Sequence, residues 1–288
     1  LVNYGFLPRE HVALMHPRQA KRVWDADTQH KAADVLAYVQ AHGPVHPRQI
    51  EQHFAQGNVT NYWGGSSSAT THLLDGMHYR GMLRVVRRDS GTRVYEAVAH
   101  PPTDDSPASR AQRAAALVAL VVHKYAPLPA ASLTYLVRLL GYGAPHLAPQ
   151  IQTALRLAKQ ELASCQINGT TWYWPADENP ASRRHTPDGA VRLLAPFDPV
   201  VWDRRRFTLL WDWTYKFEAY TPAPQRKLGY YALPLLWHDR VIGWANVTAP
   251  QGHMVVNFGY ADKAPQGADF RAALDDELQR MAYFLAAH

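Results

Sequence analysis

Two tight turns, each preceded by three amphipathic segments, most constrain the fold of this chain. In residues 29–102, three segments with apolar residues at helical spacing precede two β-type runs that are joined by Asp89-Ser90-Gly91. The same order recurs downstream, where Asn168-Gly169 predicts a second hairpin. Three helices followed by a two-stranded wing are typical of a winged-helix domain. The sequence therefore predicts two such domains in tandem, at 25–103 and 108–178.

Residues 188–288 predict a different architecture. The predicted strands are an alternating run from Tyr215 to Tyr220, a hairpin of 230–236 with 241–247, and a strand over 254–260. A terminal helix follows, with Phe270, Leu274, Leu278, Met281 and Leu285 on its apolar face. The predicted fold class is thus α+β: tandem winged-helix domains, then a small antiparallel β-barrel or sheet domain with a C-terminal helix.

Charge favours a polyanionic partner. The 288 residues carry a formal net charge of +6, and the pI is about 9.4. A basic enzyme with small acidic substrates is the alternative. The chain starts at Leu1 without a start methionine, and 1–24 is interpreted as the remnant of an upstream module. We expect a monomer that binds double-stranded DNA in the cytoplasm, associated with the nucleoid, without a membrane segment.

The cysteine content points to the same compartment. Cys165 is the single cysteine of the chain, so an internal disulfide is excluded, as is typical of a reducing cytosol. We expect Cys165 to be a small buried apolar residue at the start of a strand.

Arginines supply the candidate phosphate contacts. Arg204, Arg205 and Arg206 follow the apolar, proline-bounded run 195–202, and guanidinium groups bind phosphate oxygens in bidentate fashion. The alternative for these three is a salt-bridge network with Asp203 and Asp212.

The first predicted wing and the helix before it supply further candidates. Wings commonly follow the DNA backbone or enter the minor groove. The start of a recognition helix faces DNA, and its dipole favours phosphate. The candidate DNA-binding residues of this region are Ser68, Thr70, His72, Arg80, Arg84, Arg87, Arg88 and Arg93.

Several motifs together resemble one known family. They are Pro196-Phe197-Asp198-Pro199, Trp202-Asp203-Arg204, Tyr220-Thr221-Pro222-Ala223 and Gly229-Tyr230-Tyr231, with weaker support from Trp63-Gly64 and Arg93-Val94-Tyr95. In this spacing the chain resembles the AlkZ/YcaQ-like winged-helix DNA glycosylases over nearly all of its length. The resemblance implies tandem winged-helix modules and a barrel that cradle duplex DNA. It also implies excision of alkylated bases and, in some members, unhooking of interstrand crosslinks.

The resemblance also concerns catalysis. It implies a catalytic Gln-x-Gln or Gln-x-Asp element upstream of the segment that resembles Leu1-Val2-Asn3-Tyr4, and hence missing from this chain. Gln150-Ile151-Gln152 matches that pattern in the wrong module, where Ile151 belongs to a buried helical stripe, so its glutamines are interpreted as surface residues. The resemblance further implies Arg, Asp and Lys at alternate positions of the strand that follows the turn at 238–240, where this chain has Trp244, Asn246 and Thr248.

Other catalytic and cofactor sites are not expected. Loss of a cationic alkylated base needs electrostatic stabilisation of the sugar and a positioned water, with neither metal nor cofactor. Asp198 and Asp203 suggest a carboxylate pair, but aspartates in turns usually bind nearby backbone. The histidines lack metal-ligand spacing. Two rival functions stay open, namely a non-enzymatic winged-helix regulator of transcription and a protein-interaction scaffold.

Overall fold

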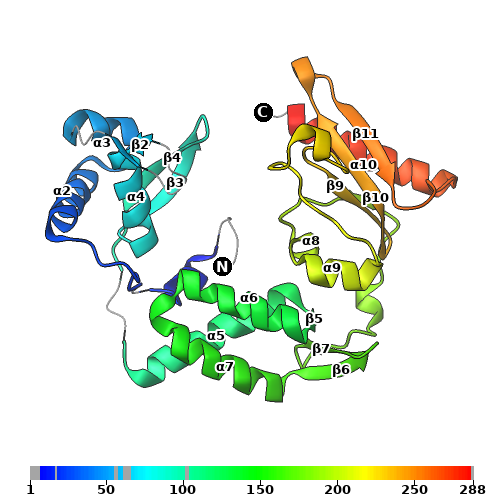
Figure 1. The fold of residues 1–288 in the computed structure, drawn as a ribbon, viewed down its shortest axis with the longest axis horizontal. Helices are drawn as coiled ribbons and strands as arrows, with labels where there is room; N and C mark the ends of the chain where they lie inside the picture. The colour runs from blue at the N-terminus through cyan, green and yellow to red at the C-terminus, as the bar shows by residue number, and fades with distance from the viewer. Residues whose placement is uncertain (1–6, 17, 55–57, 61–65, 101–103, 287–288) are drawn as a thin grey trace. The chain divides into compact units, whose positions relative to one another are not determined.

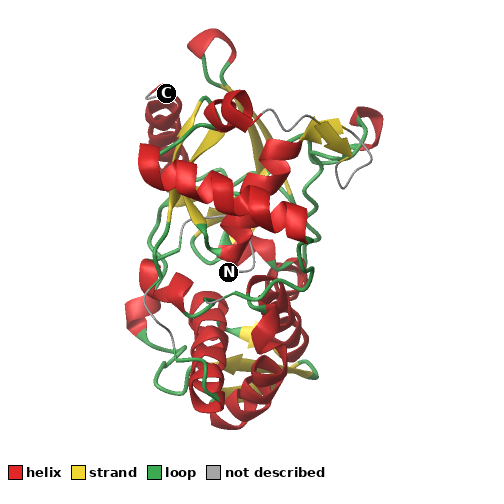
Figure 2. Cartoon of the chain, turned by 90° about the vertical axis from the view of Figure 1, so that its left-hand side faces the viewer, coloured by secondary structure: helices red, strands yellow, loops and turns green. Residues whose placement is uncertain are grey.

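The computed structural model describes residues 7–16, 18–54, 58–60, 66–100 and 104–286. The chain divides into two compact units. Figure 1 labels the helices and strands of the chain. Unit 1 comprises residues up to 121 together with 135–160, and unit 2 comprises 122–134 together with 161–288. Each unit contains helices and strands, in agreement with the predicted α+β class (Figure 2). None of the helices in the described part of the chain is both long and apolar enough to cross a bilayer.

The first part of unit 1 contains the three helices and the hairpin expected from the sequence, together with a two-stranded sheet before the third of these helices that was not expected. Its elements are α1 (Arg9–Ala13), α2 (Ala26–His42), α3 (Pro47–Phe54), β1 (Asn58–Thr60), β2 (Ser66–Ser68), α4 (Ala69–Arg80), β3 (Leu83–Asp89) and β4 (Thr92–Ala97). Asp25 caps α2 by accepting a 2.8 Å hydrogen bond from the Thr28 N–H. His46 precedes α3, and its Nδ1 accepts from the Arg48 N–H at 3.1 Å. Gly81 ends α4 with φ +82°, a conformation that glycine adopts without strain.

The core of this part is formed by α2, α3, α4 and the β3–β4 hairpin. Val35, Ile50 and Leu74 are fully buried and belong to one apolar cluster with Tyr95 of β4, and Trp24 packs against the same cluster. The segment before α2 therefore contributes to the core of unit 1. Within the segment 1–24, α1 is a short helix, whereas Leu1-Val2-Asn3-Tyr4 and, further on, Trp63-Gly64 lie outside the described residues.

A second set of helices followed by a hairpin is also present. It consists of α5 (Pro107–Tyr125), β5 (Leu128–Pro129), α6 (Ala130–Gly143), the 3₁₀ turn Pro145–Leu147, α7 (Ala148–Glu161), β6 (Ala163–Ile167) and β7 (Thr170–Trp174). The division between the units falls within its helices. Asn168 and Gly169 both have positive φ, as the predicted hairpin turn requires. The expectation that Cys165 is buried is wrong, because its side chain is exposed on β6.

The rest of unit 2 is an open sheet with helices. Its elements are β8 (Val191–Leu193), α8 (Pro199–Trp202), α9 (Arg204–Trp211), β9 (Leu233–Trp237), β10 (Arg240–Thr248), β11 (Val255–Tyr260), α10 (Ala268–Ala286) and the 3₁₀ turns Arg183–His185, Ala223–Gln225 and Pro250–Gly252. The strands are antiparallel in the order β11-β10-β9-β8. Leu235 packs with Phe270 of α10, and the next residue, Leu236, packs with Phe207 of α9. The sheet thus buries one face against α10 and the other against α9.

Two predictions for this region need correction. Within the described residues the four strands do not close into a barrel, since β8 and β11 are the edges of the sheet. The run Tyr215–Tyr220 is not a strand either. Tyr215 and Glu218 are the buried residues of this run, and both lie in a loop, so burial there does not follow the alternation of the sequence. The Tyr215 hydroxyl donates to the Ala232 carbonyl at 2.7 Å, and Glu218 accepts backbone N–H groups. Side-chain bonds to backbone replace the strand ladder there.

Candidate nucleic-acid interface

The arginines of the β3–β4 hairpin lie on an exposed ribbon but differ in their partners. Arg84 faces Glu96 across the hairpin and forms an ion pair with it. Arg87 pairs with Asp89 at 3.0 Å. Exposed ion pairs contribute about 0–1 kcal/mol, so either arginine can exchange its carboxylate for a phosphate at small cost.

The turn of this hairpin holds a differently engaged arginine. Arg88 Nη1 donates to the Gly91 carbonyl at 2.8 Å, and among the contacts of the described residues it has no carboxylate partner. Opposite Arg88 stands Arg93, whose Nη1 is 2.5 Å from Asp75 Oδ1 on α4. A β-bulge between Val85 and Arg87 shifts the register, so both Arg87 and Arg88 are exposed. Arg88 therefore carries the charge of this hairpin that is best placed for a phosphate.

Arg80 makes contacts within unit 1. Its guanidinium stacks 3.6 Å from the centre of the Trp24 ring and donates to the carbonyls of Gly76 (3.2 Å) and Arg22 (2.8 Å). Burial lowers its pKa from the ordinary value, but arginine stays charged. Arg80 joins α4 to the segment before α2, which is a structural role that the sequence does not reveal.

The candidate residues at the start of the predicted recognition helix also differ in their exposure and contacts. Thr70 is 1% exposed, so its side chain does not reach the surface. Ser68 precedes α4 but does not cap it, and its hydroxyl instead donates to Glu51 at 2.7 Å. His72 is exposed near the start of α4. Of these three candidates, His72 presents an exposed side chain.

The Arg204–Arg206 cluster is mostly internal. Arg206 is 4% exposed and donates to the carbonyls of Tyr125 and Pro199. Arg204 donates to the carbonyls of Pro196 (3.0 Å) and Val201 (2.5 Å). In the described part of the chain, the side-chain hydrogen bonds of Arg204 and Arg206 thus go to main-chain carbonyls, not to the carboxylates that the salt-bridge alternative expects. Burial lowers the pKa of both arginines. Arg205, between them, is exposed.

The aspartates beside this cluster have the structural role that turn chemistry favours. Asp198 Oδ1 accepts from the Val200 N–H at 2.7 Å and caps α8. Asp203 caps α9 by accepting from the Arg206 N–H at 3.3 Å, and it is buried. The two carboxylates thus stabilise successive helix starts.

Glu218 is a buried acid that the sequence interpretation missed. It accepts from the N–H groups of Lys227 (2.8 Å) and Leu228 (2.7 Å). Desolvation alone would raise its pKa, but these two donors and the Gly229 N–H hold the pKa below its ordinary value. Gly229 has φ +114°, and a Cβ there would lie 2.4 Å from the Asn246 side chain. The sequence signal that could have identified Glu218 is an acidic residue followed closely by a turn that contains glycine, here Gly229.

Two uncharged residues of β10, Trp244 and Asn246, make structural contacts. Trp244 stacks on Trp213 with ring centres 5.8 Å apart. Asn246 Nδ2 donates to the Leu228 carbonyl at 2.7 Å and so holds the same turn as Glu218. The uncharged side chains at these two positions support the sheet and the loop beside it.

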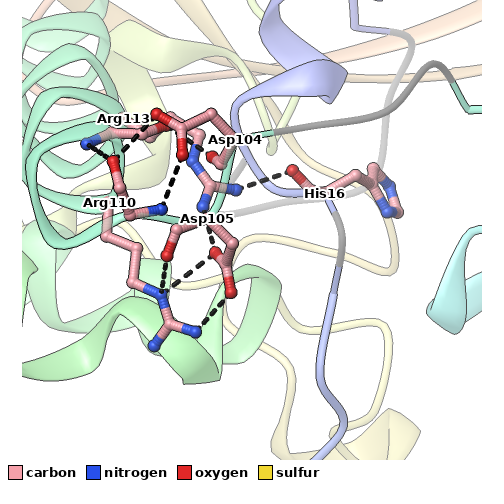
Figure 3. A network of polar contacts seen from close by, with 7 residues as sticks. His16, Asp104, Asp105, Arg110 and Arg113 are labelled. Atoms are coloured by element: carbon pink, nitrogen blue, oxygen red, sulfur yellow. Dashed lines mark hydrogen bonds and ion pairs between the residues drawn. The ribbon is translucent and has the colours of Figure 1, made fainter.

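A polar network lies at the start of α5 and in the residues just before it (Figure 3). Asp105 accepts from Arg110 (3.0 Å) and from Arg113 (2.7 Å), and Arg113 also donates to the His16 carbonyl at 2.7 Å. The hydrogen bond from Arg110, foremost, lowers the pKa of Asp105. Asp104 binds the Ser106 N–H and hydroxyl, both at 2.8 Å. Arg113 thus fastens the segment before α2 to α5 within unit 1.

The Gln150-Ile151-Gln152 motif lies on α7. Ile151 is buried, as its stripe predicts, and Gln152 is exposed. Gln150 is half-buried rather than on the surface, and its Oε1 has no hydrogen-bond partner among the described residues. No group of three or more His, Cys, Asp or Glu side chains in the described part of the chain is arranged to hold a metal ion.

Comparison with known proteins gives one family. The model of the family described as DNA glycosylase AlkZ-like matches residues 2–284. No solved structure matches this chain.

Proposed function

Because this chain belongs to the AlkZ-like DNA glycosylase family, we propose that it binds duplex DNA as part of a monofunctional glycosylase that removes alkylated bases. The observation that carries the proposal is the extent of the family match, which spans residues 2–284. Unhooking of interstrand crosslinks is part of the same proposal, because it requires cleavage of the same type of N-glycosidic bond.

The two helix–hairpin sets are the proposed DNA-binding modules. We infer that each is a winged-helix domain, because each places three helices before a hairpin. Arg87, Arg88 and Arg93 on the first wing, with His72 on α4, are the proposed contacts of unit 1. Arg205 is the proposed contact of unit 2. Arg84 stays a candidate contact of the same hairpin, because it is ion-paired as Arg87 and Arg93 are. The internal roles of Ser68, Thr70, Arg80, Arg204 and Arg206 support omitting them from the footprint.

Bond cleavage is proposed to depend on a Gln-x-Gln or Gln-x-Asp element other than Gln150-Ile151-Gln152. An amide pair can stabilise the sugar cation and position the attacking water. Gln150 is half-buried on α7 while Gln152 is exposed, so the two amides differ in their access to a substrate. A Gln150→Ala, Gln152→Ala double variant is expected to retain excision.

The test is a single-turnover excision assay with the natural protein. The substrates are duplexes with one N-alkylated purine, duplexes with an interstrand crosslink and undamaged duplexes. We expect release of the alkylated base and an abasic site that alkali cleaves. Absence of release from every alkylated and crosslinked duplex, with DNA binding intact, would refute the glycosylase proposal.

A further inference from the structure

Unit 2 carries a cluster of aromatic side chains at its surface. Phe217 lies at the centre, with its ring centre 5.4 Å from Phe197, 6.1 Å from Tyr220 and 5.1 Å from Tyr231. Tyr220 is 92% exposed, and Phe197 and Tyr231 are exposed as well. We call these four residues the aromatic cluster. Apolar rings that are exposed as a group often mark an interaction site, whereas apolar residues that are exposed singly are ordinary.

The segments that carry the cluster are held together beneath it. Arg204 donates to the carbonyl of Pro196, next to Phe197, and its guanidinium lies 4.3 Å from the centre of the buried Tyr215 ring. The Tyr215 hydroxyl in turn donates to the carbonyl of Ala232, next to Tyr231. One arginine and one tyrosine therefore join three segments that are distant in sequence.

A second pair of contacts orders the Tyr220 side of the cluster. Glu218 binds the N–H groups of Lys227 and Leu228, and Arg226 Nε donates to the Thr221 carbonyl at 2.8 Å. The backbone on both sides of Tyr220 is thereby fixed while its ring stays in solvent. Rings presented on an ordered backbone lose little conformational entropy when a ligand packs on them.

The exposed charges of the segment 213–231, which carries three of the four rings, are positive. Lys216 and Lys227 are exposed, and the Arg226 guanidinium lies 4.9 Å from the centre of the exposed Tyr230 ring. Glu218 is the one acidic residue in the sequence between 213 and 231, and it is buried against backbone donors. The surface therefore combines exposed aromatic faces with cations and offers no exposed carboxylate in that segment.

We propose that the aromatic cluster is a stacking site for an unstacked base of DNA, with Tyr220 as the principal ring and Lys216 and Lys227 as phosphate contacts. Bases stack on aromatic side chains regardless of sequence, and flanking cations bind the backbone on either side. An acidic protein partner would also match the charges and the exposed rings, but the family match makes DNA the expected polyanion. The proposal rests on the proposed function, because it requires that this protein binds DNA.

The experiment compares two duplexes of equal length and sequence, one fully paired and one with a single unpaired 2-aminopurine. Wild-type protein is expected to bind the second more tightly and to quench the 2-aminopurine fluorescence. Tyr220→Ala should remove the quenching and weaken binding of the unpaired-base duplex by about 10-fold, while Tyr220→Phe keeps both. Tyr283→Ala is the matched control, because Tyr283 is 80% exposed in unit 2 outside the cluster.

The outcomes separate the two proposals. If wild-type protein binds neither duplex, the proposed DNA-binding function fails. If wild-type protein binds DNA but Tyr220→Ala and Phe197→Ala both bind the unpaired-base duplex as Tyr283→Ala does, the stacking site is wrong and DNA binding stands. Unchanged circular dichroism spectra of the variants exclude unfolding as the cause, since Tyr220 is almost fully exposed.

Discussion

At the residue scale, burial decides which arginines are available to DNA. The sequence alone does not distinguish the three adjacent arginines, yet Arg206 is buried and Arg205 is exposed. The reason is helical geometry, because consecutive residues of α9 point about 100° apart around the helix axis. Sequence composition predicts the charge of such a cluster, and only packing predicts the direction of each side chain.

Arg205 and Arg206 are adjacent in the sequence but differ in burial, so alanine substitutions at the two positions should have different effects. Arg206→Ala leaves the carbonyls of Tyr125 and Pro199 without their donor, so we expect the free energy of unfolding to fall by about 1–3 kcal/mol. Arg205→Ala should leave stability unchanged and weaken duplex binding. Urea denaturation and fluorescence anisotropy measure the two effects. Equal stability of both variants would contradict the internal role of Arg206.

A second residue-scale prediction concerns pH. Burial, followed by the charges of Arg18, His100, His146 and His78, lowers the pKa of His16 to about 4. The unfolded chain therefore takes up this proton first as pH falls. The contribution of neutral His16 to stability is present above about pH 6.5 and is lost progressively down to about pH 4, by up to roughly 3 kcal/mol.

The measurement is the urea midpoint between pH 7.5 and 4. His16→Phe should flatten the fall in stability over this range, because it removes the proton site while keeping a ring to stack on His100. His253→Phe replaces an exposed histidine and serves as the control. A pH profile of His16→Phe identical to that of the wild type would contradict the assignment.

At the scale of elements, local turn chemistry made the hairpins predictable. Asn168-Gly169 and the turn before Thr92 specify their conformations through positive φ, which neighbouring residues alone determine. The order of helices was also readable, because apolar stripes reflect burial directly. The loop Tyr215–Tyr220 was not, since its apolar and polar residues alternate as in a strand, whereas its buried side chains, Tyr215 and Glu218, bind backbone groups outside the run. The open edges of the last sheet depend on such long-range pairing too.

The first hairpin yields a prediction at this scale. Arg88→Ala should weaken binding to all duplex sequences alike and reduce the slope of log K against log salt by about 0.9, the value for one phosphate contact. Arg84→Ala, on the same strand, should change the slope less, because Arg84 already pairs with Glu96. Equal and unchanged slopes for both variants would remove this hairpin from the DNA footprint.

At the scale of the whole molecule, the family match and the net charge of +6 together favour binding to duplex DNA of any sequence over binding to a single operator. We expect affinities for scrambled duplexes to agree closely at one salt concentration. A transcriptional regulator would instead prefer one site by about 10³-fold or more. Footprinting on a random-sequence library distinguishes these outcomes, and strong selection of a single sequence would favour the regulator.

The exposed position of Cys165 has a practical consequence. It is the only thiol in the chain and stands on the surface of β6. A maleimide dye will therefore attach at one known point of the native sequence, and air oxidation can join only two separate molecules through it. Storage under a reductant, followed by labelling at that point, provides a ready optical reporter for a titration with oligonucleotides.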